Sequence, residues 1–330
     1  MFSVSGKGQA LFIVQLVCLH IVWTVTALRV LARLRRQTGT AIYLREDAFM
    51  DAAVLLYTIL AVVALHAVAG GGIGKHVDSI SVAEATVAFR AWFICELLYG
   101  PLSAVVRTSI LLFLLRLRPS QLDRIVLYAC LATIYLFTTV YFFLNLLQCS
   151  PPSFFWRQFA EADLQGSCAH PHMVPKAAIA HSAVSAPSDW VTALMAVKLM
   201  RQSMLDSRTK TVVMVFLSLG AVAGAVMIVR IPFVQLLEMT PDFLYSTVDV
   251  AMWSVMEPCI GIVAGSLPFV RMLFGQRRKG PNRRAESGLD LPELPASGGI
   301  HVSTTWEVQS VSMDRDRTVA AHNASVTSVF

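Results

Sequence analysis

The sequence predicts an all-α membrane protein, a seven-transmembrane-helix bundle with its N-terminus outside and its C-terminus in the cytoplasm. The first observation is composition: 55% of the 330 residues are hydrophobic and only 15% are charged, whereas soluble domains contain about 25% charged residues. The second is that the apolar residues form seven runs of roughly 20 residues, each long enough to cross a bilayer. A lipid bilayer is therefore the expected environment of this chain.

The seven runs follow one another along the chain, and short polar connections separate them. They cover approximately residues 10–31, 49–69, 91–117, 125–147, 174–200, 211–236 and 246–270. We take residues 1–275 as one transmembrane domain. From Gln276 onward Pro, Ser, Gly and charged residues dominate, which is typical of disordered segments. Residues 276–330 are therefore expected to be a disordered cytoplasmic tail.

The basic residues predict the orientation, because cytoplasmic loops of membrane proteins carry an excess of Lys and Arg. Most of them collect on one side, at Arg29, Arg33, Arg35, Arg36, Arg116, Arg118, Arg124, Lys198, Arg201, Arg208, Lys210 and the cluster from Arg271 to Arg284. The other side carries Lys7, Lys75, Arg157 and Lys176. The N-terminus is therefore expected outside. Basic clusters between apolar runs are typical of lipid-headgroup contacts, so we expect no nucleic-acid partner.

The third run carries an acid and a base inside an apolar segment. Glu96 and Arg107 are eleven residues apart, so they project from one helix face at a spacing of about 16 Å. At this spacing they do not contact each other. Each must therefore face another helix or trapped water rather than lipid.

Further polar residues inside the runs form two groups by depth. Glu96, Tyr99, Arg230 and Asp249 belong to the outer half, and Arg107, Asp189 and Glu257 belong nearer the middle or the inner half. An unpaired charge at this depth costs at least about 3 kcal/mol. We therefore predict that Arg230 pairs with Glu96 or Asp249, and that Arg107 pairs with Asp189 or Glu257. All seven are candidate ligand-binding residues, and the alternative is a set of structural ion pairs without a ligand.

Two cysteines bracket the connection after the fourth run. Cys149 and Cys168 lie on the expected outer face, which is an oxidising environment. A disulfide between them closes a loop of about 20 residues and contributes roughly 3 kcal/mol. The competing pair, Cys95 with either of them, ranks second because Cys95 lies at least one turn below the surface.

The sequence contains no recognisable catalytic or cofactor motif. The seventh run has no Lys to anchor a retinal Schiff base. There is no nucleophile elbow and no zinc-peptidase helix. His181 in the fifth run is not accompanied by a second His or Cys at metal-binding spacing. We therefore assign no catalytic residue, no metal site and no cofactor.

The ordered set of motifs over residues 28–274 resembles the fungal rhodopsin-domain integral membrane proteins, a family that includes receptor-like surface-sensing proteins. The resemblance rests on Glu96-x-x-Tyr99, Arg107-x-Ser109-Ile110-Leu111-Leu112-Phe113, Cys149-x-Pro151, Gly166-x-Cys168, Asp189, Arg230, Asp249 and Trp253-x-x-x-Glu257. Arg107 stands where the family usually has Lys. The resemblance implies a seven-helix membrane protein that is often encoded beside secondary-metabolite genes.

The leading hypothesis is a non-catalytic, receptor-like protein of a fungal membrane that serves a secondary-metabolite pathway. Its outer polar group would bind a small lipophilic ligand, and its basic inner loops would contact a cytoplasmic signalling partner. The first alternative is a membrane-embedded biosynthetic enzyme that uses Asp189, Asp249 or Glu257 as a general acid on a lipophilic intermediate. The second alternative is a small-molecule transporter.

Overall fold

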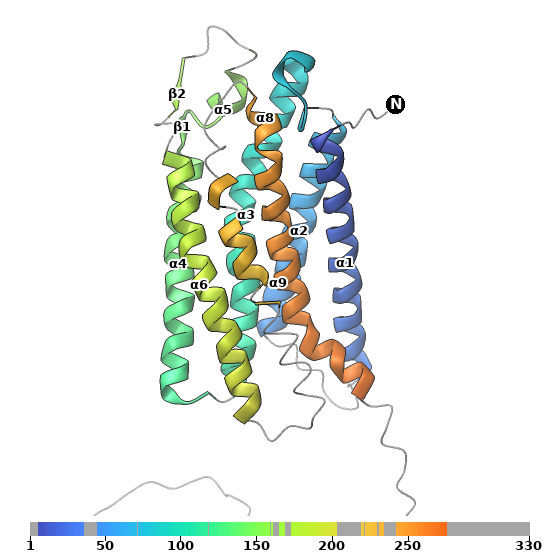
Figure 1. Cartoon of the computed structure of the whole chain (residues 1–330), viewed down its shortest axis with the longest axis vertical. Helices are drawn as coiled ribbons and strands as arrows, with labels where there is room; N and C mark the ends of the chain where they lie inside the picture. The colour runs from blue at the N-terminus through green and yellow to red at the C-terminus, as the bar shows by residue number, and fades with distance from the viewer. Residues whose placement is uncertain are drawn as a thin grey trace, which may run out of the picture. The chain divides into compact units, whose positions relative to one another are not determined.

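The computed structural model shows a bundle of long helices (Figure 1). It describes residues 6–35, 45–70, 72–117, 119–158, 160, 165–168, 173–202, 219–220, 222–229, 231–233 and 242–275. The long helices are α1 (Lys7–Arg35), α2 (Arg45–Ala69), α3 (Val82–Arg116), α4 (Gln121–Leu146), α6 (Met173–Gln202) and α9 (Val248–Gly275). The short elements are η1 (Val77–Ser79), α5 (Phe154–Arg157), α8 (Phe243–Ser246) and the strands β1 (Cys149–Ser150) and β2 (Ser167–Cys168).

Five of these helical segments are long and apolar enough to cross a membrane, namely α1, α2, α3, α4 and the segment from α8 into α9. The fifth predicted run corresponds to α6, which has 30 residues but is rich in Ala and Ser and carries several charges. In the sixth predicted run, residues 219–220, 222–229 and 231–233 are helical, and the other half of the run lies outside the described residues. The count of seven spans stays a prediction, as does the disordered tail, because residues 276–330 are also outside the described part.

The described part of the sixth run packs closely against α6. A Cβ atom added at Gly220 would lie 2.5 Å from the Cβ of Ala193, and one added at Gly224 would lie 2.2 Å from Nε1 of Trp190. Two glycines four residues apart bring helix backbones together in membrane bundles. The spacing of these glycines therefore explains how this segment joins the bundle.

Helix α3 lies among the other helices and extends further than the sequence predicted. Its 35 residues span about 52 Å, compared with about 30 Å for the hydrocarbon core. It begins nine residues before the predicted run because Ser81 caps it: the Ser81 side chain accepts from the Glu84 N–H, and the Glu84 carboxylate accepts from the Ser81 N–H. This capping box, Ser-x-x-Glu, was a readable signal for the true start of the helix.

One end of the bundle carries α5, α8, both strands and the beginning of α1 (Figure 1). An aromatic cluster holds these parts to α3. Phe89 stacks on Phe243 at 5.5 Å between ring centroids, and Phe93 contacts Trp156 at 5.3 Å. Aromatic pairs in this distance range add about 0.5–1.5 kcal/mol beyond the area that they bury. The loop between α4 and α6 is thereby anchored on α3.

Ion pairs join the helices at the opposite end. Asp47 on α2 binds Arg29 at 2.8 Å and Arg33 at 2.7 Å, both on α1, and Glu46 binds Arg116 of α3 at 2.9 Å. Arg29 also donates to the Gly265 carbonyl of α9 at 2.8 Å. Four helices are therefore cross-linked there, and the three arginines involved were used above only to predict the orientation.

Candidate functional site

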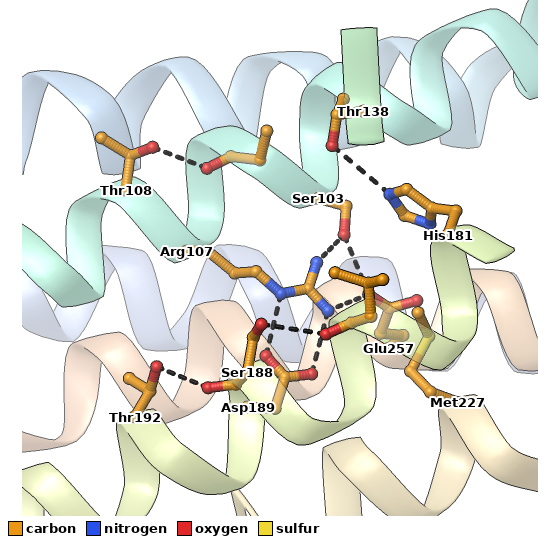
Figure 2. A network of polar contacts seen from close by, with 12 residues as sticks. Ser103, Arg107, Thr108, Thr138, His181, Ser188, Asp189, Thr192, Met227 and Glu257 are labelled. Carbon is orange, nitrogen blue, oxygen red and sulfur yellow. Dashed lines mark hydrogen bonds and ion pairs between the residues drawn. The ribbon is translucent and has the colours of Figure 1, made fainter. Parts of the chain in front are cut away.

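Arg107 of α3 is the centre of a buried polar network (Figure 2). Its guanidinium binds Asp189 of α6 through two parallel hydrogen bonds, Nε–Oδ1 at 2.8 Å and Nη2–Oδ2 at 2.9 Å. Nη2 also donates to Oε1 of Glu257 on α9 at 2.9 Å, and Nη1 donates to the hydroxyl of Ser103. Both predicted partners of Arg107 are thus bound at once, which confirms the predicted pairing.

The three charged side chains are almost removed from solvent. Their exposed fractions are 8% for Arg107, 14% for Asp189 and 4% for Glu257. One cation faces two carboxylates, so hydrogen bonds must supply part of the stabilisation. Ser103 donates to Oε1 of Glu257 at 2.9 Å, and the Tyr99 hydroxyl donates to Oε2. Each Glu257 oxygen therefore accepts at least one hydrogen bond, as a buried carboxylate requires.

The helix period explains why α3 supplies most of this network. Tyr99, Ser103 and Arg107 recur every four residues and so lie on one face. Tyr99 was assigned by its depth to the same group as Glu96 and Asp249. Its hydroxyl, however, donates to Glu257, a member of the other group. The Cα–Cβ bonds of a helix tilt toward its N-terminus, so the long Arg107 side chain extends toward Ser103 and brings the network within reach of Tyr99.

One member of the outer group, Asp249, has a partner that was not predicted. Asp249 binds Lys7 of α1 at 2.7 Å, and this ammonium also lies 4.8 Å from the Tyr245 ring centroid. Lys7 served above only to predict the orientation, although Lys7 and Asp249 lie in the first turns of α1 and α9 at the same end of the bundle. Arg230 lies outside the described residues, so its pairing with Glu96 or Asp249 stays a prediction.

A cavity of about 70 Å³ lies between α1, α2, α3, α4 and α9. We call it the outer cavity. Its polar lining includes Trp92, Glu96, Tyr99 and Ser254, and the rest is mainly apolar. Trp92 is 8% exposed, and among the residues that the structure describes its indole Nε1 has no hydrogen-bond partner. Buried donors are normally paired, so this N–H is a candidate donor to a ligand or water oxygen.

A second cavity of about 60 Å³, the inner cavity, lies on the other side of the network. Ser103, Arg107, Asp189 and Glu257 line it, together with Thr192 and residues of the sixth run. Tyr99 lines the outer cavity and donates to Glu257 of the inner one. The Tyr99–Glu257 hydrogen bond therefore connects the linings of the two cavities.

His181 of α6 lies between the network and α4. Its Nε2 is 3.3 Å from Oγ1 of Thr138, and its ring stacks on Tyr141 at 5.1 Å. His181 is therefore a hydrogen-bonded residue of the helix interior. Within the described ranges, no group of three or more His, Cys, Asp or Glu side chains is arranged to hold a metal ion.

The disulfide between Cys149 and Cys168 is present, which confirms the predicted pair. The two residues face each other in the antiparallel pairing of β1 with β2, and α5 lies within the closed loop. Cys95 is a free thiol, so the competing pairing is wrong.

We expect Cys149→Ser to lower the free energy of unfolding by roughly 3 kcal/mol, because the closed loop is about 20 residues long. Chemical denaturation of the purified protein in detergent micelles measures this loss. Cys130→Ser, which removes a free thiol of α4, is the matched control and should unfold like the wild type. An equal midpoint for Cys149→Ser and wild type would contradict the expectation.

These features define a multi-pass integral membrane protein with an ionic network buried among its helices. The chain belongs to the fungal rhodopsin-domain family: the family model described as "Fungal rhodopsin domain" matches residues 28–276. The match includes every residue of the network and confirms the resemblance inferred from the motifs. No match was found among curated proteins or among solved structures.

Proposed function

We propose that this chain is a non-catalytic, receptor-like seven-helix protein, with its N-terminus outside, that binds a small lipophilic molecule in the outer cavity. The observation that carries the proposal is the buried Trp92 N–H, which has no hydrogen-bond partner in the described part of the chain and belongs to the lining of a largely apolar cavity. The helical residues of the sixth run, which pack on α6, support a seventh span.

The lining of the outer cavity suggests the chemistry of the ligand. Apolar side chains from four helices favour a mainly hydrocarbon molecule, and the Trp92 N–H favours one with an acceptor such as a carbonyl oxygen. The cavity volume of about 70 Å³ is well below the roughly 300–1,000 Å³ of pockets for larger ligands. Binding must therefore separate the surrounding helices, which couples ligand binding to a change of conformation.

The Tyr99 hydroxyl provides the route by which this change reaches the inner half. It lines the outer cavity and binds Glu257, which in turn binds Arg107. A ligand that displaces the Tyr99 ring removes a hydrogen bond from Glu257. The remaining contacts between Glu257 and Arg107 then rearrange. The inner cavity, lined by Arg107, Asp189 and Glu257, changes shape in response.

The same contacts favour a receptor over an acid-catalysed enzyme. A general acid must hold a proton within reach of its substrate. Asp189 and Glu257 instead accept hydrogen bonds from Arg107, and Asp249 accepts from Lys7. Each of the three candidate acids is therefore bound to a cation.

The proposal predicts that a fraction of a lipophilic culture extract raises the melting temperature of the purified wild-type protein. Ala64→Leu, which adds volume to the lining of the outer cavity, should abolish this rise. Ala52→Leu makes the same change on an exposed position of α2 and should retain it. If both variants respond equally to the active fraction, the outer cavity is not the binding site.

We further infer that the basic loops contact a cytoplasmic signalling partner, and that the sensed molecule belongs to a secondary-metabolite pathway. Gene deletion followed by metabolite and transcript profiling tests this. A receptor should alter the expression of a whole pathway. Accumulation of a single unmodified precursor, reproduced by Glu257→Gln, would instead support the enzyme alternative.

A further inference from the structure

A groove lies outside the two cavities, on the N-terminal half of α3. One stripe of α3 from Arg90 to Pro101 forms a groove with Phe142 of α4 and Trp156 of α5. The groove has a volume of about 450 Å³, which is within the range of ligand pockets, roughly 300–1,000 Å³. Apart from Arg90, every residue of its lining is apolar or aromatic.

Arg90 is the exposed, charged end of this groove. Among the residues that the structure describes, none forms an ion pair or hydrogen bond with its guanidinium. It directly precedes the apolar run of α3, at the boundary where that helix enters the hydrocarbon core. A cation at this depth requires an anionic partner or water. Phosphate groups of lipids are the anions available at this level.

The groove also has the length of one lipid leaflet. Arg90 and Pro101 are eleven residues apart, which corresponds to about 16 Å along a helix. The hydrocarbon core is about 30 Å thick, so the groove extends from the headgroup level to the middle of the bilayer. Trp156 lies on α5, at the end of the bundle that carries the disulfide loop, and Trp side chains favour the membrane–water interface.

We propose that this groove is a binding site for one phospholipid of the outer leaflet. The phosphate binds the Arg90 guanidinium, which forms paired hydrogen bonds with phosphate oxygens. One acyl chain lies along the apolar stripe between Phe93 and Pro101. This site is separate from the outer cavity, and its existence does not depend on the receptor function proposed above.

Native mass spectrometry of the delipidated full-length protein, titrated with phosphatidylglycerol in detergent, tests the proposal. The wild type should bind one lipid more tightly than any further ones. Arg90→Gln should weaken this first binding step about tenfold, because it removes a charged hydrogen-bond donor. Leu97→Trp keeps the charge but fills the groove, and it should weaken the same step.

Arg124→Gln is the matched control, because it removes an exposed arginine at the opposite end of the bundle. It should leave the first binding step unchanged. All variants should melt at the wild-type temperature, since the altered side chains are exposed or half-buried. Equal phosphatidylglycerol affinity of wild type and Arg90→Gln would overturn the proposal. A sterol that displaces phosphatidylglycerol equally well from the wild type and from Arg90→Gln would also overturn it.

Discussion

Replacing Arg107 by Met should lower the free energy of unfolding by about 3–5 kcal/mol, because it leaves two buried carboxylates without their shared cation. The side chains of Asp189 and Glu257 are only 14% and 4% exposed, so water does not replace the lost hydrogen bonds. Thermal and chemical unfolding of the purified protein in micelles measure the loss. A decrease below about 1 kcal/mol, the range of exposed pairs, would contradict the buried network.

Two further variants separate charge from packing. The triple variant Arg107→Met, Asp189→Asn, Glu257→Gln removes all three charges and should recover much of the lost stability, since no uncompensated charge remains. Arg107→Lys keeps the charge but loses the paired hydrogen bonds with Asp189. It should be intermediate, which also tests how the residue that is usual in the family fits this position.

Tyr99→Phe should retain ligand binding in the outer cavity but lose its effect on the inner cavity. The variant keeps the aromatic ring and removes the hydroxyl that donates to Glu257. Coupling between sites typically corresponds to a 5–150-fold change in affinity or population. We therefore expect the ligand-induced change at the inner cavity to decrease by about fivefold or more in Tyr99→Phe. Thr192 lines the inner cavity. Thr192→Cys, labelled with a thiol reagent, therefore reports changes in the inner cavity.

The measurement compares labelling of Thr192→Cys with and without the active extract fraction. In the wild-type background the fraction should change the labelling rate, and Tyr99→Phe should remove that change while the fraction still raises the melting temperature. Tyr141→Phe removes another hydroxyl from the lining of the outer cavity and serves as the control. A response that persists in Tyr99→Phe would show that another contact connects the two cavities.

Several features were predictable because they depend on local or strongly constrained physics. The apolar runs anticipated the six long helices of the described part, since the hydrocarbon core sets their length. The Cys149–Cys168 pair followed from the position of both cysteines in one polar connection between apolar runs. The partners of Arg107 followed from the cost of an unpaired charge in lipid, which leaves few choices among the carboxylates at the same depth.

Other features depend on side-chain reach and three-dimensional packing. Tyr99 was assigned to the outer group by the depth of its backbone, but its hydroxyl binds Glu257 of the Arg107 network. Arg107 lies two turns further along α3, and its long side chain binds Asp189 in the same network. Arg230 was the predicted partner of Glu96 or Asp249, and Lys7 at the start of α1, which binds Asp249, was not considered as a partner. The outer cavity, with the Trp92 N–H in its lining, arises only when five helices pack together, and the inner cavity arises when four segments do.

The protein carries its own reporter for the central claim. Cys95 lines the outer cavity and is a free thiol, whereas Cys130 is a free thiol of α4 that does not line it. Site-resolved mass spectrometry measures how fast a small methanethiosulfonate modifies each of them. If the outer cavity binds the ligand, the fraction that raises the melting temperature slows modification of Cys95 severalfold and leaves Cys130 unchanged. Stabilisation of the protein without protection of Cys95 would contradict a ligand site in the outer cavity.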